Sequence, residues 1–400
     1  MRGKIRTAMV CTVMLCVAAC AGGSAGEGAP GASSQGQGVS DKVIKLGATL
    51  PLTGGAADNG KAFRAGMEAA IEEINEAGGI NGRTLEMKVL DDGFQPARTV
   101  SNILRLLEQD KVFALNAPVG SAGIPGAYSM IERTGAPMFG PYLPPDPDLP
   151  SVFLLPTPHR EQGEVMTSWL AGEGVKRVAF IGQDNEYGHA ILDGVKEAAA
   201  RDNVEVVEVA LTETNSTNVN PSVLSAKRAS PDALVLGTDN AQTTLVLKQV
   251  KQLGWDIRIV AGSSAAGTGS STTVGPAGEA AEGLYGAAIA ALPNSDTDAV
   301  KKYHEAMKKY RPDADSDNIY ALVFYAQQQV FFEILRRMGN DLTWENFQKV
   351  SESLKSFETG LLPPITFGEL PGGHTGSHGV IIAQYLNGKW ATKTDFIQAG

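Results

Sequence analysis

The sequence predicts an α/β protein of two lobes, each a doubly wound parallel sheet with helices on both faces. Short β-branched apolar runs alternate with stretches of helical periodicity along most of the chain. A proline-rich stretch over residues 141–158 separates two series of expected strands, each long enough for one sheet. The length of 400 residues also suggests about two domains. Alternation of this kind is typical of parallel sheets that are buried on both faces.

The elements follow in order from residue 43. A β-branched strand is expected over residues 43–50, and residues 61–77 carry apolar side chains at helical spacing before Gly78 and Gly79, which stop the helix. The tail differs, because Asn387-Gly388 lies between two apolar runs and predicts an antiparallel hairpin. The other expected elements are a helix over 97–109 and strands over 85–90, 112–117, 137–140, 177–182, 204–211, 233–237, 257–261, 284–290, 379–385 and 389–394.

A boundary between the lobes is expected close to His159, where the proline-rich stretch ends. Ligands of open α/β sheets bind at the carboxyl ends of the strands. In a two-lobed chain those ends can face each other across a cleft, so the loops that follow the strands form the candidate site.

The first residues have the layout of a secretory signal. Arg2, Lys4 and Arg6 precede an apolar stretch over residues 8–19, which ends in Val-Ala-Ala before Cys20. A transmembrane anchor is the alternative, but a span needs ~20 apolar residues and this stretch offers only about a dozen. The Val-Ala-Ala-Cys order resembles a bacterial lipobox, in which the cysteine receives a lipid before cleavage. We therefore expect a lipoprotein signal peptide over residues 1–19 and lipidation of Cys20.

Residues 20–40 are expected to form a flexible tether, because they are mostly Gly, Ala, Ser and Gln with little charge. Cys11 and Cys16 fall in the discarded signal, so the mature chain keeps no thiol for a disulfide or a metal site. Removing three of the 34 basic residues leaves 31 against 44 acidic ones. This acidic balance disfavours nucleic-acid binding.

Two segments near the start carry a resemblance to a known family. They read LGATLPLTGG at residues 46–55 and AAIEEINEAGGINGR at residues 69–83, and they are similar to the opening of the branched-chain amino-acid binding protein family. Supporting pieces follow in the family's order: LDDG at 90–93, FIGQDNEYG at 180–188, PDALVLG at 231–237 and LGW at 253–255. The resemblance covers residues 41–400.

The resemblance implies the type I periplasmic-binding fold, in which three segments of chain join the lobes as a hinge. The first lobe would comprise residues 41–158 and 289–361, and the second residues 159–288 and 362–400. It further implies a solute-binding lipoprotein of an ABC importer, which captures an amino acid or a related amide, aliphatic or aromatic carboxylate and is not an enzyme. A small-molecule ligand, permease subunits and the outer face of the membrane are the implied partners of a monomer.

Three matched positions are candidate ligand-binding residues. Ser121 matches the family serine that holds the ligand carboxylate, although a serine before a helix can also be a plain N-cap. Tyr187 matches the cleft tyrosine, whose ring packs the ligand and whose hydroxyl can donate. Asp239 follows a strand and can pair with a ligand ammonium, while a helix cap or Asx turn is the alternative role.

The departures from the family concern the ligand's charges. The acidic residue that binds the α-ammonium falls at Ser263, and the Ala-x-Thr segment near the carboxylate reads Tyr142-Leu143-Pro144. Asn59 stands where some members carry tyrosine. A buried ammonium without a partner costs several kcal/mol. Either Asp239 replaces the missing acid or the ligand is not an α-amino acid, and an amide or an apolar or aromatic carboxylate suits the site about as well as leucine.

Several other constellations are set aside. The nucleophile, P-loop, zinc-protease and dinucleotide fingerprints are absent from the sequence. His374 and His378 would need a helix to act as a metal pair, and the glycines around them disfavour one. We therefore expect no metal and no cofactor, and His159 is read as an isolated histidine. A lipid-tethered receptor that signals to a membrane kinase remains the alternative to import.

Overall fold

The computed structural model describes residues 36–400 apart from 122, 143–147, 215, 267–272 and 369–373. The expected signal peptide, Cys20 and most of the expected tether lie outside the described residues. Residues 36–40, which were also assigned to the tether, are bound to the folded body. The Gln37 side-chain amide donates to the carbonyls of Leu107 and Val112 at 3.0 Å each. These bonds anchor the last part of the expected tether beside the first strand.

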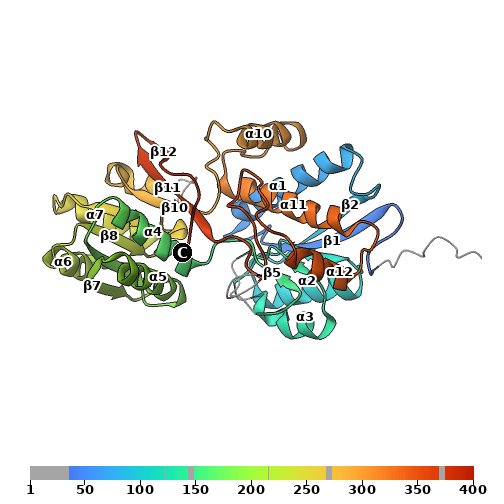
Figure 1. The fold of residues 1–400 in the computed structure, drawn as a ribbon, viewed down its shortest axis with the longest axis horizontal. Coiled ribbons are helices and arrows are strands. Elements are labelled where there is room, and N and C mark those ends of the chain that lie inside the picture. The colour runs from blue at the N-terminus through green and yellow to red at the C-terminus, as the bar shows by residue number, and fades with distance from the viewer. Residues whose placement is uncertain (1–35, 122, 143–147, 215, 267–272, 369–373) are drawn as a thin grey trace, which may run out of the picture. The chain divides into compact units, whose positions relative to one another are not determined.

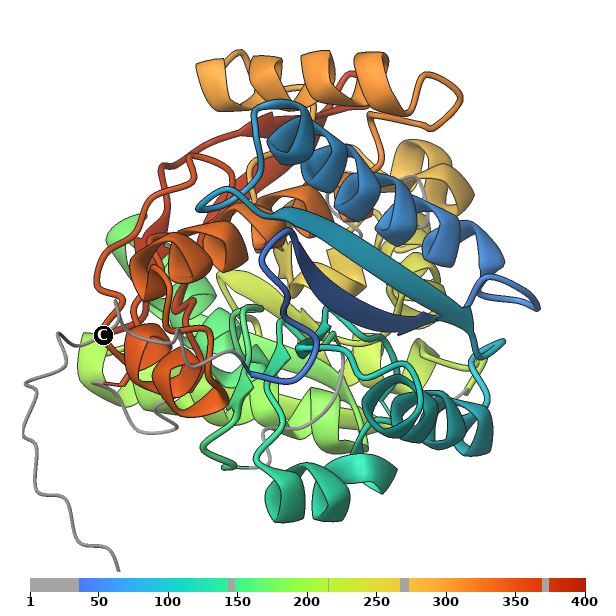
Figure 2. The same cartoon turned by 90° about the vertical axis from the view of Figure 1, so that its right-hand side faces the viewer.

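The first sheet contains five parallel strands in the order β2-β1-β3-β4-β5. Helices α1, α10, α11 and α12 contribute to the core on one face, and α2, η1 and α3 to the core on the other (Figures 1 and 2). The strands are β1 (Val43–Leu50), β2 (Thr84–Asp91), β3 (Ala114–Asn116), β4 (Met138–Phe139) and β5 (Val152–Phe153). The helices are α1 (Ala57–Glu76), α2 (Pro96–Glu108), η1 (Pro125–Ala127), α3 (Tyr128–Thr134), α10 (Asp298–Tyr310), α11 (Ile319–Met338) and α12 (Trp344–Glu352).

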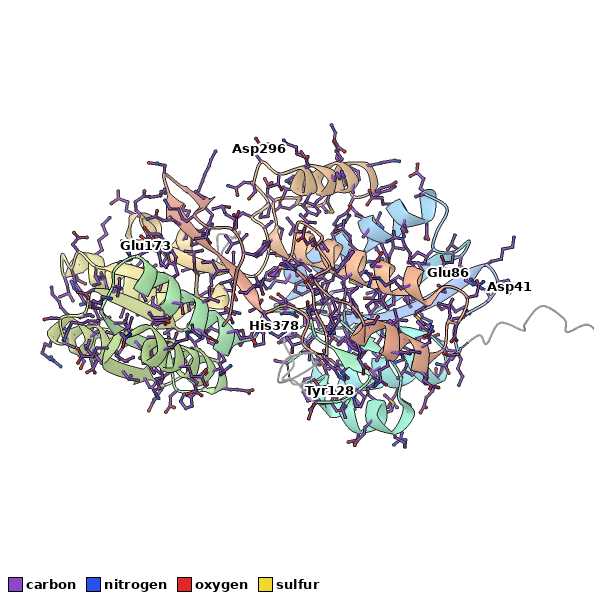
Figure 3. The ribbon with its side chains drawn as sticks, viewed as in Figure 1. Asp41, Glu86, Tyr128, Glu173, Asp296 and His378 are labelled. Atoms are coloured by element: carbon purple, nitrogen blue, oxygen red, sulfur yellow. The ribbon has the colours of Figure 1, made fainter. Side chains whose placement is uncertain are left out.

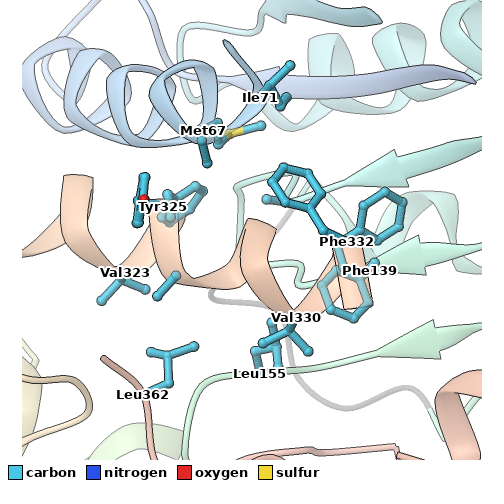
Figure 4. Packing of buried hydrophobic residues seen from close by; sticks show 14 of the residues in the cluster. Met67, Ile71, Phe139, Leu155, Val323, Tyr325, Val330, Phe332 and Leu362 are labelled. Carbon is cyan, nitrogen blue, oxygen red and sulfur yellow. The ribbon is translucent and has the colours of Figure 1, made fainter. Parts of the chain in front are cut away.

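The helices α1 and α11 cross at very short range because a glycine lies at the contact. A Cβ atom on Gly66 would lie 2.0 Å from the carbonyl oxygen of Ala321. Around this crossing Met67 and Ile71 of α1 pack in one core with Tyr325 and other residues of α11 (Figure 4). Close backbone approach of this kind needs a residue without a side chain.

The second sheet has a parallel centre and an antiparallel edge. Its order is β12-β11-β10-β9-β8-β6-β7, with β13 paired to β11. The strands are β6 (Arg177–Gln183), β7 (Glu205–Thr212), β8 (Ala233–Gly237), β9 (Arg258–Ala261), β10 (Tyr285–Ala288), β11 (Gly379–Leu386), β12 (Lys389–Thr392) and β13 (Ile397–Gln398). The helices are α4 (His159–Gly172), α5 (Glu186–Asp202), α6 (Asn220–Arg228), α7 (Asn240–Gln252), α8 (Ser263–Ala266), α9 (Val274–Ala277) and η2 (Gly278–Ala281).

The helices α4 and α5 also cross through glycines. A Cβ atom on Gly194 would lie 1.8 Å from the carbonyl oxygen of Arg160, and one on Gly163 would lie 2.2 Å from that of Ile191. The two helices cover one face of the second sheet, and their apolar side chains form a core with β6, β8 and β10. The position of the first turn of α4 therefore depends on the absence of side chains at these two glycines.

The chain passes between the two sheets three times: after β5, after β10 and before β11. The first and third passages are joined by hydrogen bonds. The Thr157 hydroxyl donates to the carbonyl of Gly379 at 2.7 Å and lies 2.8 Å from the Ser377 hydroxyl. Leu362 and Phe367 pack in the core of the first sheet. The third passage therefore follows Phe367, beyond residue 361, where the family resemblance implied that the first lobe ends.

The expected fold class is confirmed: the protein is α/β with two doubly wound, mainly parallel sheets in two lobes. The tail hairpin is confirmed as well, with Asn387 and Gly388 in the left-handed region at its turn. Strand β5 was not expected. Within the part of the chain that is described, no helix is both long and apolar enough to cross a membrane.

Candidate functional site

A cavity of about 570 Å³ lies between elements of the two sheets. Five of the six residues singled out from the sequence line it, and each lies shortly after a strand of one of the two sheets, in a loop or at the start of the helix that follows: Ser121, Tyr142, Tyr187, Asp239 and Ser263. The sixth, Asn59, is exposed in the first turn of α1 and is not among the residues that line the cavity. The structure thus brings together side chains that are up to 142 positions apart in the chain, as Ser121 and Ser263 show.

Tyr142 forms the aromatic wall on the first-sheet side. Its backbone continues the strand ladder, because its N–H donates to Pro118 at 2.9 Å. The ring packs against Phe63, Tyr320 and Phe324, with ring centroids 5.8, 6.1 and 5.7 Å away. Burial and the neighbouring Tyr320 raise the pKa of the Tyr142 hydroxyl well above its ordinary value. The group therefore stays protonated at neutral pH and offers an apolar face and a hydrogen-bond donor.

Ser121 lies in the loop after β3 with its side chain exposed. The N-cap of η1 is Ile124 and that of α3 is Ala127, so Ser121 caps neither of them. Its hydroxyl is therefore not needed to start a helix. Ser121 is one of the residues that line the cavity.

Asp239 combines a structural role with a place in the cavity wall. It is the N-cap of α7, where one carboxylate oxygen accepts from the N–H of Gln242 at 2.7 Å. The other oxygen accepts from the Gln183 amide at 2.9 Å. Each oxygen of a carboxylate has two acceptor sites, so neither contact exhausts it. The helix-cap role considered for Asp239 is thus real, and the carboxylate still faces the site.

Tyr187 lies between the first turn of α4 and the loop after β9. Its ring is perpendicular to that of His159, with centroids 4.6 Å apart. Its hydroxyl is buried and makes no hydrogen bond within the described part of the chain. Burial raises the pKa of this hydroxyl, although the nearby Ala265 amide and Ser264 hydroxyl act in the opposite direction. The loop can come so close because residue 262 is a glycine, whose Cβ would lie 2.6 Å from the Tyr187 oxygen.

Ser263 begins the short helix α8 and is half-buried. Its backbone N–H donates to the side-chain oxygen of Gln162 at 3.0 Å. The acidic side chains among the described lining residues are Asp239 and Glu186, and the basic one is Arg160, which is paired with Glu197 outside the lining. The charge of this lining therefore suits a cationic or zwitterionic ligand better than a lone anion.

Sequence reasoning missed His159 and Gln162, which also line the cavity. His159 is the first residue of α4, and burial lowers its pKa to about 4. Gln162 is exposed by only 1 %, and its side chain contacts the first passage between the lobes, the first turn of α4 and the start of α8. The sequence feature that could have pointed to His159 is its position directly after the proline-rich stretch, at the start of a helix.

The histidines near the tail have other partners than a metal. Nδ1 of His378 lies 3.0 Å from both carboxylate oxygens of Glu161, and Nε2 lies 2.8 Å from the carbonyl of Thr375. His378 stands directly before β11, in the third passage (Figure 3). Nδ1 of His374 lies 2.9 Å from the carbonyl of Leu149. No group of three His, Cys, Asp or Glu side chains that could hold a metal exists among the described residues.

Comparison with known proteins is consistent with this arrangement. The sequence profile of a family described as periplasmic binding protein matches residues 43–389. The leucine-, isoleucine-, valine-, threonine-, and alanine-binding protein of Pseudomonas aeruginosa is 26% identical over 325 residues, which make up 79% of this chain and 84% of that protein. The resemblance to branched-chain amino-acid binding proteins is thereby confirmed.

Solved structures share the fold. A branched chain amino acid ABC transporter protein from Thermus thermophilus with bound valine aligns with a TM-score of 0.72 at 19% identity, over 90% of this chain and 97% of that chain. A fatty acid ABC transporter substrate-binding protein from Thermomonospora curvata aligns with a TM-score of 0.73 at 24% identity, over 91% and 94%. Because the family profile covers most of the chain, we conclude that the protein belongs to the periplasmic binding protein family and binds a solute outside the cytoplasm rather than catalysing a reaction.

Proposed function

We propose that the protein is the lipid-anchored, solute-binding component of an ABC importer and that its ligand is a small apolar amino acid or a close relative. The observation that carries this proposal is the cavity, to which Ser121 and Tyr142 contribute from one lobe and Tyr187 and Asp239 from the other. A ligand that contacts both lobes favours the closed state, and it shifts the equilibrium by its differential affinity for that state. The closed form then docks on a permease, and Cys20 holds the protein at the membrane.

The charges of the lining support a ligand that carries an ammonium group. Asp239 supplies a carboxylate at the cavity, so an ammonium is not left unpaired although residue 263 is a serine. Opposite charges at contact distance recover part of the cost of burying each one. The ligand's carboxylate is assigned to Ser121 and its apolar side chain to the Tyr142 wall. The P. aeruginosa relative, named for binding leucine, isoleucine and valine, supports the same class of ligand.

The test is a ligand screen of residues 41–400 by thermal shift, followed by calorimetric titration. The panel contains L-leucine, L-isoleucine, L-valine, their amides, aromatic acids and short aliphatic acids, since a ligand of the folded state raises its melting temperature. We expect the amino acids or their amides to bind. A protein that responds to none of these compounds would refute the proposal, and a response to acids alone would refute the assignment of an ammonium.

The variant Asp239→Asn tests the partner of the ammonium. The asparagine oxygen can still accept from the Gln242 N–H and so keep the cap of α7, while the negative charge and the bond from the Gln183 amide are lost. We expect the affinity for L-leucine to fall at least tenfold, because a charged hydrogen bond contributes ~1.5–3 kcal/mol. An unchanged dissociation constant, with an unchanged melting temperature of the free protein, would remove Asp239 from the site.

A further inference from the structure

The side chain of Gln162 has one possible orientation. Its oxygen accepts from the backbone N–H of Ser263 at 3.0 Å, and its nitrogen donates to the carbonyl of Thr157 at 3.0 Å. A backbone N–H can only donate and a carbonyl can only accept, so exchanging the two ends of the amide would break both bonds. The NH₂ end of Gln162 is therefore identified by its partners, and not by convention.

This orientation sets the tautomer of His159. The same Gln162 nitrogen lies 3.3 Å from Nδ1 of His159. Because that nitrogen is a donor, Nδ1 must accept, and the proton of the neutral ring is on Nε2. A doubly protonated ring would place an N–H against an N–H at this contact. Burial acts in the same direction and lowers the pKa of His159 to about 4.

The remaining donor of the ring is Nε2–H, on a residue that lines the cavity. His159 lines the cavity next to Tyr187, and its ring stands perpendicular to the tyrosine ring at 4.6 Å. Nε2 makes no hydrogen bond to any residue in the described parts of the chain. A neutral imidazole whose Nδ1 already accepts has only a donor left to offer.

We propose that His159 is a ligand-binding residue whose Nε2–H donates a hydrogen bond to a carboxylate or carboxamide oxygen of the ligand. Gln162 is the positioning residue that holds the ring in this tautomer. The inference rests on the proposed function and sharpens it. The ligand must carry an oxygen acceptor that reaches His159 in addition to the cationic group that Asp239 accommodates.

The contacts of Gln162 explain why the Nε2–H donor of His159 keeps one orientation. Its three contacts join the first passage between the lobes, the first turn of α4 and the start of α8. The donor is therefore oriented before the ligand arrives, and little ordering remains for binding to impose. Because the ring is neutral, the donor is present across the neutral pH range without adding a charge to the cavity.

The experiment compares two substitutions of His159 by calorimetric titration of the intact mature protein with L-leucine, L-isoleucine and L-valine. His159→Phe keeps a ring against Tyr187 but has no donor, whereas His159→Gln keeps an N–H donor near the place of Nε2. We expect the phenylalanine variant to bind 10–100-fold more weakly, as loss of a hydrogen bond to a charged group requires. The glutamine variant should stay within about threefold of the wild type. His189→Gln is the matched control, because His189 is exposed on α5 and does not line the cavity.

A spectroscopic readout separates a binding role from a packing role. Long-range proton–nitrogen spectra of the free protein should show His159 as the Nε2–H tautomer, with a shift of that nitrogen when L-leucine is added. Gln162→Glu, which cannot donate to Nδ1, should change the tautomer.

Four results would overturn the inference: an Nδ1–H ring in the wild type, no shift of Nε2 on binding, an unchanged tautomer in Gln162→Glu, or an unchanged affinity in His159→Phe. If the wild type binds the amino acids but one of these results is found, the inference alone fails. If the wild type binds none of them, the proposed function fails and the inference fails with it.

Discussion

The contact between α4 and α5 connects the packing of the second lobe to the cavity. Gly194 lies on α5, is buried and does not line the cavity. A Cβ atom at this position would lie 1.8 Å from the carbonyl oxygen of Arg160, whereas real Cβ atoms keep at least 3.0 Å. In Gly194→Ala the first turn of α4 must therefore move by at least about 1.2 Å relative to α5. That turn carries His159, while α5 carries Tyr187.

Both stability and affinity should respond to Gly194→Ala. Overpacking of a close contact lowers the free energy of unfolding by ~1–3 kcal/mol, and by more where backbone must move. The better helix propensity of alanine offsets only ~1 kcal/mol of this loss. We expect a net loss of about 2 kcal/mol in the free energy of unfolding. A displacement of about 1 Å in a preformed site can cost up to ~100-fold, so we expect the affinity for L-leucine to fall at least tenfold.

The assay is urea unfolding together with calorimetric titration, and Gly172→Ala is the control. Gly172 is the last residue of α4, and a Cβ atom there meets nothing within 4 Å. The control should keep its affinity and should be as stable as the wild type or slightly more stable. If Gly194→Ala matches the wild type within 0.5 kcal/mol and twofold in affinity, roughly the uncertainty of such measurements, the argument from helix contact to cavity is refuted.

Three further perturbations test other parts of the molecule. Ser121→Ala should weaken binding of a ligand carboxylate at least tenfold without lowering the melting temperature, since the side chain is exposed; an unchanged dissociation constant removes Ser121 from the site. Gly66→Ala should lower the free energy of unfolding by about 2 kcal/mol, because its Cβ would lie 2.0 Å from the oxygen of Ala321, and a wild-type urea midpoint would contradict this. Burial lowers the pKa of His378, but the Glu161 carboxylate and the Thr375 carbonyl raise it more, so the net shift is upward from 6.5. The stabilisation of the fold by the His378–Glu161 pair is therefore complete below about pH 6.5 and is lost as pH rises through the folded-state pKa of His378. Between pH 6 and 9 the melting temperature should fall more steeply for the wild type than for His378→Gln. Equal slopes for the two proteins would refute the contribution of this pair.

Local patterns predicted most of the secondary structure. The strand expected over residues 233–237 is β8 without change, and β1 was predicted at both ends. The tail hairpin followed from Asn387-Gly388, whose positive φ angles suit its tight turn. These elements depend on neighbours in sequence, such as apolar alternation and turn chemistry. Strand β5 has only two residues, and it is a strand because β4 lies beside it, so no local pattern marks it.

The site was predicted in part, because the ends of strands can also be recognised from local sequence patterns. The segments that follow strands could be recognised, and Ser121, Tyr142, Tyr187, Asp239 and Ser263 lie in such segments, in loops or at helix starts, around one cavity. Asn59 was chosen by alignment alone, and its side chain is exposed on α1 away from the residues that line the cavity. Position along the chain does not say which way a helix turns its residues.

By itself the sequence determined that strands and helices alternate in two series, that the tail pairs antiparallel and that the chain resembles one family of binding proteins. Only the tertiary structure decided which strands are neighbours, which glycines allow α1 to meet α11 and α4 to meet α5, and where the chain returns to the second sheet after Phe367. It also decided which ring nitrogen of His159 carries the proton, because the amide of Gln162 is oriented by Ser263, which lies 101 positions further along the chain. The physical reason is the same in each case: backbone periodicity and turn preference act over a few residues, whereas close packing and hydrogen bonding depend on groups that only folding brings within contact distance.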